Sequence, residues 1–175
     1  MTVSTLFELI DAGDVDGVRE LLARDPDAAT RRDEQGLSPL MRASYRNNAE
    51  IAALLPTLDA WDRVMAGESE GLPDPHDRSP DGFTPLHLAV FARNRAAAEA
   101  LIDAGAPLNA IATASFARVT PLGTAAAFGA NDIARLLLER GADVTATADH
   151  GFTPLDAAEQ NENAEHVELL RAYGA

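Results

Sequence analysis

The stretch "DGFTPLHLAVF" at residues 81–91 recurs in modified form at three other places in the chain. The other copies are "QGLSPLMRASY" at 35–45, "ARVTPLGTAAAF" at 117–128 and "HGFTPLDAAEQ" at 150–160. A degenerate fifth copy lies in the opening segment "STLFELIDAGD" at 4–14. A catalytic motif is normally needed once, whereas a phrase repeated every ~33 to 46 residues indicates a structural unit that stacks on copies of itself.

Each copy carries the signals of a helix start. Thr84 can cap the helix through its hydroxyl, and Pro85 suits the first helical position, where its missing N–H is not needed. Leu86 and Ala89 then lie on one face at helical spacing. A short polar break leads to a second helix, which Gly105 ends because glycine tolerates the left-handed conformation. We therefore expect units of two short helices that bury their apolar faces only by stacking.

The chain resembles the ankyrin repeat family. The resemblance rests on "DGFTPLHLAV…ALIDAGAPLNA", "VTPLGTAAAFGANDIARLLLERGADVTA" and "HGFTPLDAAEQNENAEHVELLRAYGA". It implies an all-α solenoid of stacked helix-turn-helix units with short hairpin loops, and a protein that works by binding other proteins. His87 keeps the family's usual histidine after "TPL", whereas Met41, Gly123 and Asp156 replace it in the other copies.

The expected organisation is a single domain over residues 1–175. Its five repeats are predicted at 1–34, 35–80, 81–116, 117–149 and 150–175, with both end repeats degenerate. The last helix carries polar residues, among them Glu165, His166 and Glu168, which suits the solvent-facing end of a stack. We expect both ends to be complete, with no further domain.

The second unit contains an insertion at about 56–80. Pro56 interrupts "EIAALLPTLDAWDRVMAG", after which Thr57 is predicted to cap a new helix whose apolar face includes Trp61 and Met65. The acidic, Gly- and Pro-rich arm at 67–79 is predicted to be a loop that folding does not require. One interpretation is a tolerated surface insertion anchored by Trp61, and the other is a partner-binding arm.

Composition narrows the classes of partner. The net charge of −14 argues against binding nucleic acid or an anionic membrane. The absence of cysteine excludes disulfides and thiol catalysis and favours a cytoplasmic location. All 14 basic residues are arginines, and alanine is abundant, which suggests a bacterium of high GC content.

No residue pattern supports catalysis. His76 lies beside Asp74 in a loop without fixed geometry, which is poor support for a metal site. His87 is interpreted as a structural residue at a helix start, and neither His150 nor His166 has an evident catalytic partner. Phosphate-binding glycine loops and nucleophile elbows are absent from the sequence. We expect no catalysis, no cofactor and no metal.

The pattern does predict a recognition surface. Tyr45, Phe91 and Phe128 lie near the ends of three successive first helices, where stacking would bring their rings into a row on the concave face. Aromatic side chains are favoured at binding hot spots. The full predicted set adds a basic margin and the hairpin tips: Gln35, Leu37, Tyr45, Arg46, Asp81, Phe83, Phe91, Arg93, Arg118, Phe128, His150 and Phe152.

The leading hypothesis is a monomeric, non-catalytic module that binds another protein through its concave groove and hairpin tips. One alternative is an acidic immunity-type antidote that masks a basic toxin, which the net charge of −14 motivates. Another is an enzyme, or an enzyme subunit, that holds a small molecule in the groove. That alternative requires a deep pocket with converging polar residues.

Overall fold

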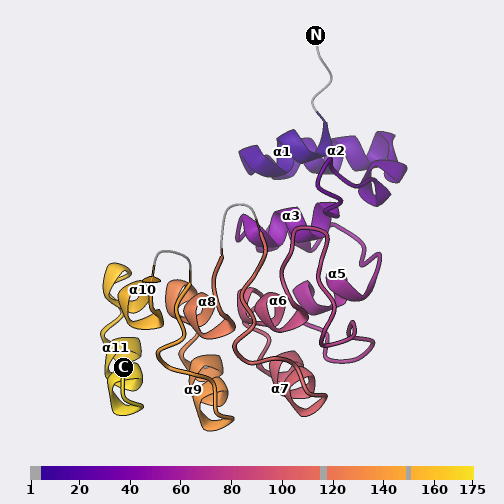
Figure 1. Cartoon of the computed structure of the whole chain (residues 1–175). Helices are drawn as coiled ribbons and strands as arrows, with labels where there is room; N and C mark the ends of the chain where they lie inside the picture. The colour runs from indigo at the N-terminus through magenta and orange to yellow at the C-terminus, as the bar shows by residue number, and fades with distance from the viewer. Residues whose placement is uncertain (1–4, 115–117, 149–150) are drawn as a thin grey trace.

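The computed structural model describes residues 5–114, 118–148 and 151–175. Helices follow one another in pairs joined by short turns, and the described residues contain no β-strand. The stack of pairs is drawn in Figure 1. The helices are α1 (Leu6–Ala12), α2 (Val15–Arg24), the 3-10 helix η1 (Pro26–Thr30), α3 (Pro39–Tyr45), α4 (Ala49–Ala52), α5 (Ala60–Met65), α6 (Pro85–Phe91), α7 (Arg95–Asp103), α8 (Pro121–Phe128), α9 (Asn131–Glu139), α10 (Pro154–Gln160) and α11 (Ala164–Ala172).

The repeated phrase starts helices as predicted. The hydroxyls of Ser38, Thr84, Thr120 and Thr153 each accept the backbone N–H three residues later, and a proline follows each as the first helical residue. Thr5 caps α1 in the same way without the proline, and Glu8 completes the capping box. Local chemistry therefore sets the beginnings of all five first helices.

The turn between the two helices of each pair has one left-handed residue. These residues are Gly13, Asn47, Arg93, Gly129 and Glu162, with φ between 51° and 69°. Three of the five are not glycine, so a conformation that side chains disfavour is kept there at some cost. The predicted terminators Gly105, Gly141 and Gly174 also have positive φ, as expected. The same backbone turn thus recurs even where the sequence does not favour it.

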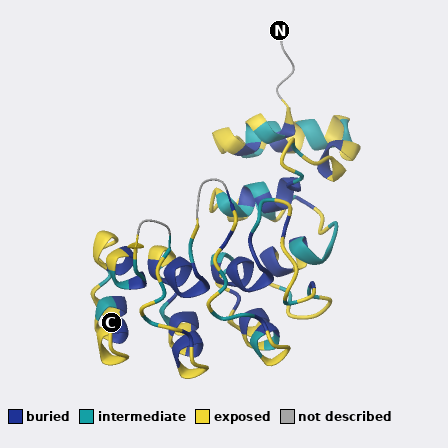
Figure 2. Cartoon of the chain, in the orientation of Figure 1, coloured by how far each residue is buried: buried dark blue, intermediate teal, exposed yellow. Residues whose placement is uncertain are grey.

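The helices form two layers. Helices α6, α8 and α10 lie side by side in one row, and α7, α9 and α11 form a second row (Figure 1). Buried leucines, isoleucines and alanines fill the space between the layers, as the dark blue inner faces show (Figure 2). Small residues such as Ala89 and Ala125, both fully buried, let neighbouring pairs approach closely. Helices α1 and α3 continue the stack but turn away from the row.

The turn in the stack coincides with α5, which lies inside the insertion. Helix α5 packs on both α3 and α6, whereas α6 and α8, or α8 and α10, pack on each other directly. Val64 and Met65 are buried in the common core, and Trp61 is half-buried against it. The predicted helix therefore exists and belongs to the core rather than to the surface. Its cap is Asp59 rather than Thr57, because the Asp59 carboxylate accepts the N–H groups of Trp61 and Asp62.

The arm at 67–79 is a loop, as predicted, but it is not uniformly exposed. Pro73 and Ser79 are buried, and the Ser79 hydroxyl lies 3.1 Å from both the Phe83 N–H and the Phe83 carbonyl. At the other end the Glu68 carbonyl accepts from the Asn94 side chain at 2.7 Å. Most of the residues between these anchored points, among them Ser69 to Gly71 and Asp77, are exposed. Ser79 is buried because the arm ends beside the next hairpin, where its hydroxyl hydrogen-bonds to the backbone of Phe83.

One polar residue that was expected on the solvent-facing side of the last helix, α11, lies inside instead. His166 is fully buried, and its Nδ1 lies 2.8 Å from the Asn131 side-chain oxygen at the start of α9. Glu165 is exposed and accepts from the Asn131 amide nitrogen at 2.6 Å. Polar residues thus occupy both faces of α11, and two of them form hydrogen bonds to Asn131 of α9.

Candidate functional site

The buried histidine of the repeated phrase is structural. Its Nδ1 lies 2.7 Å from the Thr84 hydroxyl and its Nε2 lies 2.9 Å from the Val119 carbonyl, in the loop that precedes α8. Burial lowers the pKa of His87 to about 4, so the ring is neutral at pH 7. A side chain with both nitrogens occupied, closed off from solvent, joins one pair to the next and is unsuited to proton transfer with a substrate.

Asp62 is the corresponding buried group at the second unit. Its carboxylate accepts from the Ser38 hydroxyl and, at 2.8 Å, from the Leu58 N–H. Burial raises the pKa of Asp62 above its ordinary value, while the hydrogen bond from Ser38 lowers it. Ser38 is the cap of α3, and Met41 stands where His87 stands in the third unit. Asp62 therefore supplies the hydrogen bond that a histidine supplies elsewhere.

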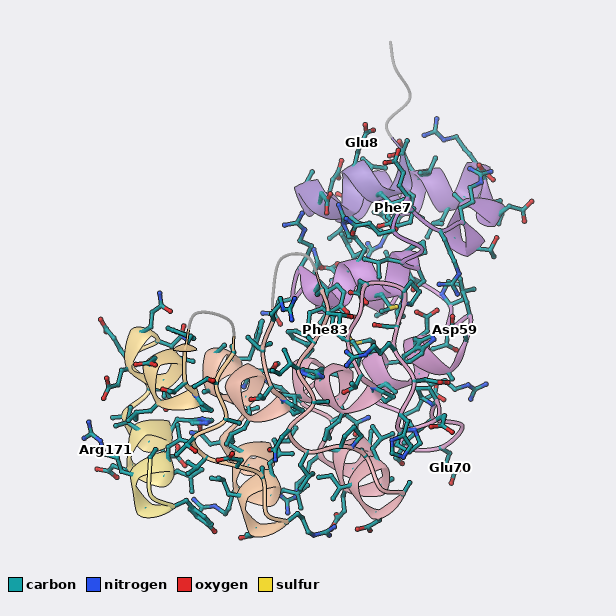
Figure 3. All side chains as sticks on the ribbon, viewed as in Figure 1. Phe7, Glu8, Asp59, Glu70, Phe83 and Arg171 are labelled. Carbon is teal, nitrogen blue, oxygen red and sulfur yellow. The ribbon has the colours of Figure 1, made fainter. Side chains whose placement is uncertain are left out.

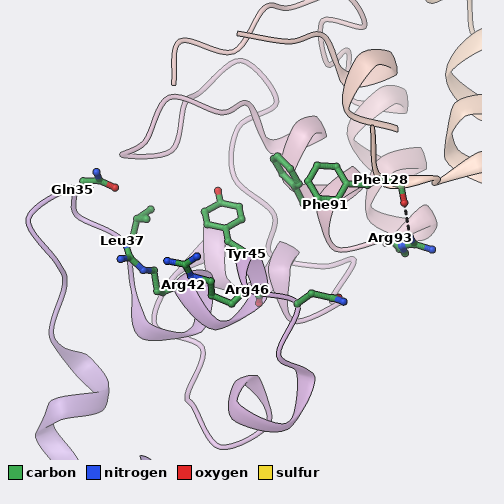
Figure 4. A pocket seen from close by; sticks show the side chains of 10 residues that line it. Gln35, Leu37, Arg42, Tyr45, Arg46, Phe91, Arg93 and Phe128 are labelled. Atoms are coloured by element: carbon green, nitrogen blue, oxygen red, sulfur yellow. Dashed lines mark hydrogen bonds between the residues drawn. The ribbon is translucent and has the colours of Figure 1, made fainter. Parts of the chain in front are cut away.

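The principal surface pocket lies at the ends of α3, α6 and α8 (Figure 4). It has a volume of about 530 Å³ and is partly open to solvent. Its lining combines an aromatic wall with guanidinium and amide groups: Gln35, Leu37, Arg42, Ser44, Tyr45, Arg46, Asn47, Phe91, Arg93 and Phe128. No described carboxylate lines it. Seven of the twelve residues of the predicted recognition set meet here.

The aromatic wall is a row of edge-to-face rings, as the repeat spacing predicts. The ring centroids of Tyr45 and Phe91 lie 5.4 Å apart, and those of Phe91 and Phe128 lie 4.9 Å apart. Both pairs are nearly perpendicular, an arrangement that aromatic quadrupoles favour. Tyr45 and Phe91 are half-buried, whereas Phe128 is 48% exposed. Tyr45 and Phe91 therefore contribute mainly to packing, whereas Phe128 is the most solvent-accessible ring of the row.

Two arginines of α3 share one carboxylate beside the pocket. Arg42 binds both oxygens of Asp11 at 2.8 and 2.7 Å, and Arg46 donates its Nε to the same side chain at 2.9 Å. Arg42 also contacts Asp33 at 3.3 Å. The hydrogen bond from Arg42 is the main cause that lowers the pKa of Asp11 to about 2. This cluster ties α1 to α3 at the edge of the pocket.

Arg93 reaches the pocket from the turn after α6. Its guanidinium donates to the Phe128 carbonyl, as the dashed line in Figure 4 shows. The left-handed backbone of Arg93 turns the side chain toward α8. Arg93 thus links the third and fourth units and adds a positive charge beside the exposed ring.

Three predicted contact residues point inward, and their expected role is corrected. Phe83 is fully buried, with its ring 6.2 Å from Tyr45 and 5.0 Å from Phe91 (Figure 3). A large apolar ring before the helix cap is held between neighbouring pairs because the core lies directly beneath it. Leu37, although it lines the pocket, is only 2% exposed.

Asp81 is the third of these residues. It is half-buried, and its Oδ1 accepts from the Ser79 hydroxyl at 2.5 Å. Its charge also acts on the buried Tyr45 hydroxyl, whose pKa is raised mainly by burial and then by Asp81. Within the described residues, neither the Tyr45 hydroxyl nor the Asp81 Oδ2 has a hydrogen-bond partner. Asp81 therefore serves the interior of the hairpin rather than its tip.

The remaining predicted residues lie apart from the pocket or outside the description. Phe152 is 39% exposed but lines a small depression between α8 and α10. Arg118 is exposed and does not line the principal pocket. His150 lies outside the described residues. Gln35 is exposed on the rim, where Asp33 holds its backbone N–H at 2.9 Å.

Arg42 and Asp11 are the important members of this region that sequence reasoning missed. Arg42 lies one helical turn before Arg46, a spacing that puts both side chains on one face of α3. That signal is readable in the sequence. The position of Asp11 is not, because it depends on how α1 docks on α3.

The described residues contain no group of three or more histidines and carboxylates placed to hold a metal ion. Across the same described ranges, no helix has the length and apolarity that crossing a bilayer requires.

Comparisons with known proteins agree with the fold. The sequence profile of the ankyrin repeats matches residues 6–112 and 108–175. The mouse B-cell lymphoma 3 protein homolog is 29% identical over 185 residues, covering 88% of this chain and 40% of that protein. Human ankyrin repeat and SOCS box protein 16 is 32% identical over 156 residues, covering 73% of this chain and 34% of that protein.

Human protein phosphatase 1 regulatory subunit 27 is 37% identical over 92 residues, covering 53% of this chain and 57% of that protein. The chain thus spans well under two thirds of the length of these relatives. The profile match, the repeated caps and the two-layer stack together show that this chain belongs to the ankyrin repeat family.

Proposed function

We propose that this protein binds a partner protein, without catalysis, through the pocket at the ends of α3, α6 and α8. The observation that carries the proposal is the exposed ring of Phe128, 48% accessible, at the end of the aromatic row and beside Arg46 and Arg93. Interfaces favour aromatic and arginine side chains at their centres. Ankyrin repeats generally mediate protein–protein interaction, and the relative named a regulatory subunit fits that role.

A rigid scaffold supports this proposal. The rings stand on helices whose starts are capped and whose inner faces are buried, so little side-chain order remains to be gained on binding. Preorganised surfaces bind with a smaller entropic cost. The buried ionisable groups His87 and Asp62 are occupied by the fold and do not face the pocket.

Two other functions stay open to the same test. An antidote that masks a basic toxin is motivated by the net charge of −14. A small-molecule site is compatible with a pocket of about 530 Å³, a size in the ordinary range for ligand sites. The proposal of a protein partner is preferred because the pocket is partly open to solvent and its charged groups are all long arginine side chains.

The test uses site-specific photocrosslinking. A photoreactive phenylalanine analogue replaces Phe128 in one variant and Tyr173, which is 43% exposed near the chain end, in a matched control. We expect the probe at position 128 to give a discrete crosslinked protein from the lysate of the native cells, and the control to give none. The same species should be lost when unlabelled protein competes.

Other outcomes select other functions. Equal crosslinking from both positions would contradict a pocket-specific partner. A crosslinked adduct of small mass at position 128 would favour the small-molecule function. A strongly basic, toxic partner held mainly outside the pocket would favour the antidote.

A further inference from the structure

Resting on the proposed function, we propose that the pocket recognises an acidic partner segment in which an aromatic side chain lies close to a carboxylate. The aromatic group packs on Phe128, and the carboxylate of the same segment binds Arg46 with help from Arg93. This assigns a chemical class to the partner and a separate role to each side of the pocket.

The aromatic requirement follows from where the row of rings ends. Tyr45, Phe91 and Phe128 are the last residues of α3, α6 and α8, although Phe128 lies one residue further from its cap than the other two. Each ring is in edge-to-face contact with the next. The next helix, α10, ends at exposed Gln160 instead of a ring. Phe128 therefore has no further described ring beside it, and nearly half of its surface faces solvent. A partner's aromatic side chain would extend the row in the geometry that the row already uses.

The carboxylate requirement follows from the arginines. Arg46 uses its Nε for Asp11, and the hydrogen bonds of the described residues do not involve its two terminal nitrogens. Its side chain is 53% exposed. A planar guanidinium with free donors is suited to a carboxylate. Asp11, held between Arg42 and Arg46, shows that this face of α3 can bind one.

Local charge favours the same class of partner. The pocket collects Arg42, Arg46 and Arg93 and has no carboxylate in its described lining, although the whole chain carries a net charge of −14. Asp11 and Asp33 pair with Arg42 and Arg46 from beside the pocket, and the charge of Asp81 acts on the Tyr45 hydroxyl from within the hairpin, whereas no described carboxylate pairs with Arg93. Because exposed charges are screened within about 8 Å at physiological salt, the local arginines outweigh the distant carboxylates.

Alternative segments fit less well. A basic segment would face three guanidiniums, and like charges in an interface are costly. A wholly apolar segment would cover Arg46 and Arg93 without pairing them, and buried unpaired charge is also costly. An acidic segment without an aromatic residue would leave the exposed face of Phe128 in water.

The test selects peptides from a random display library on the full chain. We expect enrichment of sequences in which Phe, Tyr or Trp lies within about four residues of Asp or Glu, the span of roughly one helical turn. A synthetic peptide from this set should bind at least about tenfold more weakly to Phe128→Ser and to Arg46→Gln than to the unaltered protein. Replacing its Glu by Gln should weaken it similarly on the unaltered protein but much less on Arg46→Gln.

Matched variants separate binding from folding. Arg19→Gln changes another arginine whose side chain is 53% exposed and which pairs with Glu50, so it should leave peptide affinity unchanged. Tyr173→Ser should do the same for the aromatic change. Circular dichroism of every variant checks that the helices are kept, and Arg46→Lys should recover part of the affinity because it retains the charge.

Each result has a definite meaning. Selected peptides that need Phe128 but show no acidic preference, and that bind Arg46→Gln normally, would overturn this inference and leave the proposed function standing. Peptides that bind every pocket variant equally would count against both. Binding of the pocket to a second copy of the chain, seen as Phe128-dependent dimers in light scattering, would replace the acidic partner by self-association.

Discussion

Two joints in this stack perform the same task with different chemistry. Between the third and fourth units, His87 fills the joint: it holds the Thr84 cap and reaches the Val119 carbonyl of the next unit. In the second unit Met41 occupies the matching position and cannot make those bonds. There Asp62 arrives from α5 and bonds the Ser38 cap. Histidine is therefore not the only side chain that can bond a buried cap hydroxyl in this stack.

The comparison also explains why the insertion is retained in the core. Without a histidine, the Ser38 hydroxyl would be buried and short of one partner, and such groups are costly. Helix α5 supplies that partner and at the same time fills the wedge between α3 and α6 with Val64 and Met65.

The largest expected effect tests the Asp62 joint directly. Asp62→Ala removes the acceptor of both the Ser38 hydroxyl and the Leu58 N–H, so the free energy of unfolding should fall by about 3 kcal/mol at pH 7. Urea unfolding followed by circular dichroism measures this loss. Trp61 fluorescence, next to the change, should show α5 loosening at lower urea than the whole chain.

A double variant sharpens the comparison. Adding Met41→His to Asp62→Ala should restore part of the lost stability, because the imidazole would take the place that His87 takes in the third unit. Asp77→Ala, on the exposed arm, is the neutral control. If the double variant is no more stable than Asp62→Ala alone, the two joints are not equivalent.

The second effect is an opposite response of the two joints to acid. Burial lowers the pKa of His87 and of His166 from 6.5 to about 4, so the unfolded chain binds more protons between these values. Stability from each histidine is present above pH 6.5 and is lost as the pH falls toward 4. For His87 alone the free energy of unfolding should fall by about 2 kcal/mol from pH 7 to pH 5.

The contribution of Asp62 to the pH dependence of stability has the opposite sign. Its raised pKa means that the folded chain holds the proton more strongly, so its contribution grows as the pH falls and is lost as the pH rises. Unfolding of His87→Met across the same pH range should show a shallower acid dependence than the unaltered chain. Equal slopes for the two proteins would rule out His87 as the group responsible.

The smallest expected effect concerns the arm. Deleting residues 74–77 and bridging the ends with glycine and serine should change the free energy of unfolding by less than about 1 kcal/mol. Deleting 67–79 should cost more, because it removes the Ser79 hydroxyl from the Phe83 backbone. The two deletions are compared by urea midpoint. Equal midpoints would mean that the buried ends of the arm contribute nothing.

Much of the fold was predictable because its signals are local. The cap, the proline and the terminal glycine act on residues within one helical turn, so the starts of the helices that follow the repeated phrase and several helix ends can be read from a few letters. The row formed by Tyr45, Phe91 and Phe128 was predictable for a related reason: a repeated phrase puts corresponding residues at corresponding places.

The site was predictable only in part because burial depends on neighbours. Nothing within the hairpin distinguishes Phe83, which is fully buried, from Phe152, which is 39% exposed. The difference is that Phe83 meets Tyr45 and Phe91 of the adjoining helices. Asp81 was expected at an exposed tip, yet it turns toward Ser79 because a carboxylate readily accepts within its own turn.

The sequence by itself determined the repeated helix pairs, their caps and the alignment of the ring positions, since these depend on interactions between residues close in the chain. Only the tertiary structure decided that Asp62 would complete the Ser38 cap and that Asp11 would join Arg42 and Arg46. It also decided that α5 would enter the core and form the turn beside the pocket. Those pairings join residues far apart in sequence, and the docking of one unit on the next alone brings them together.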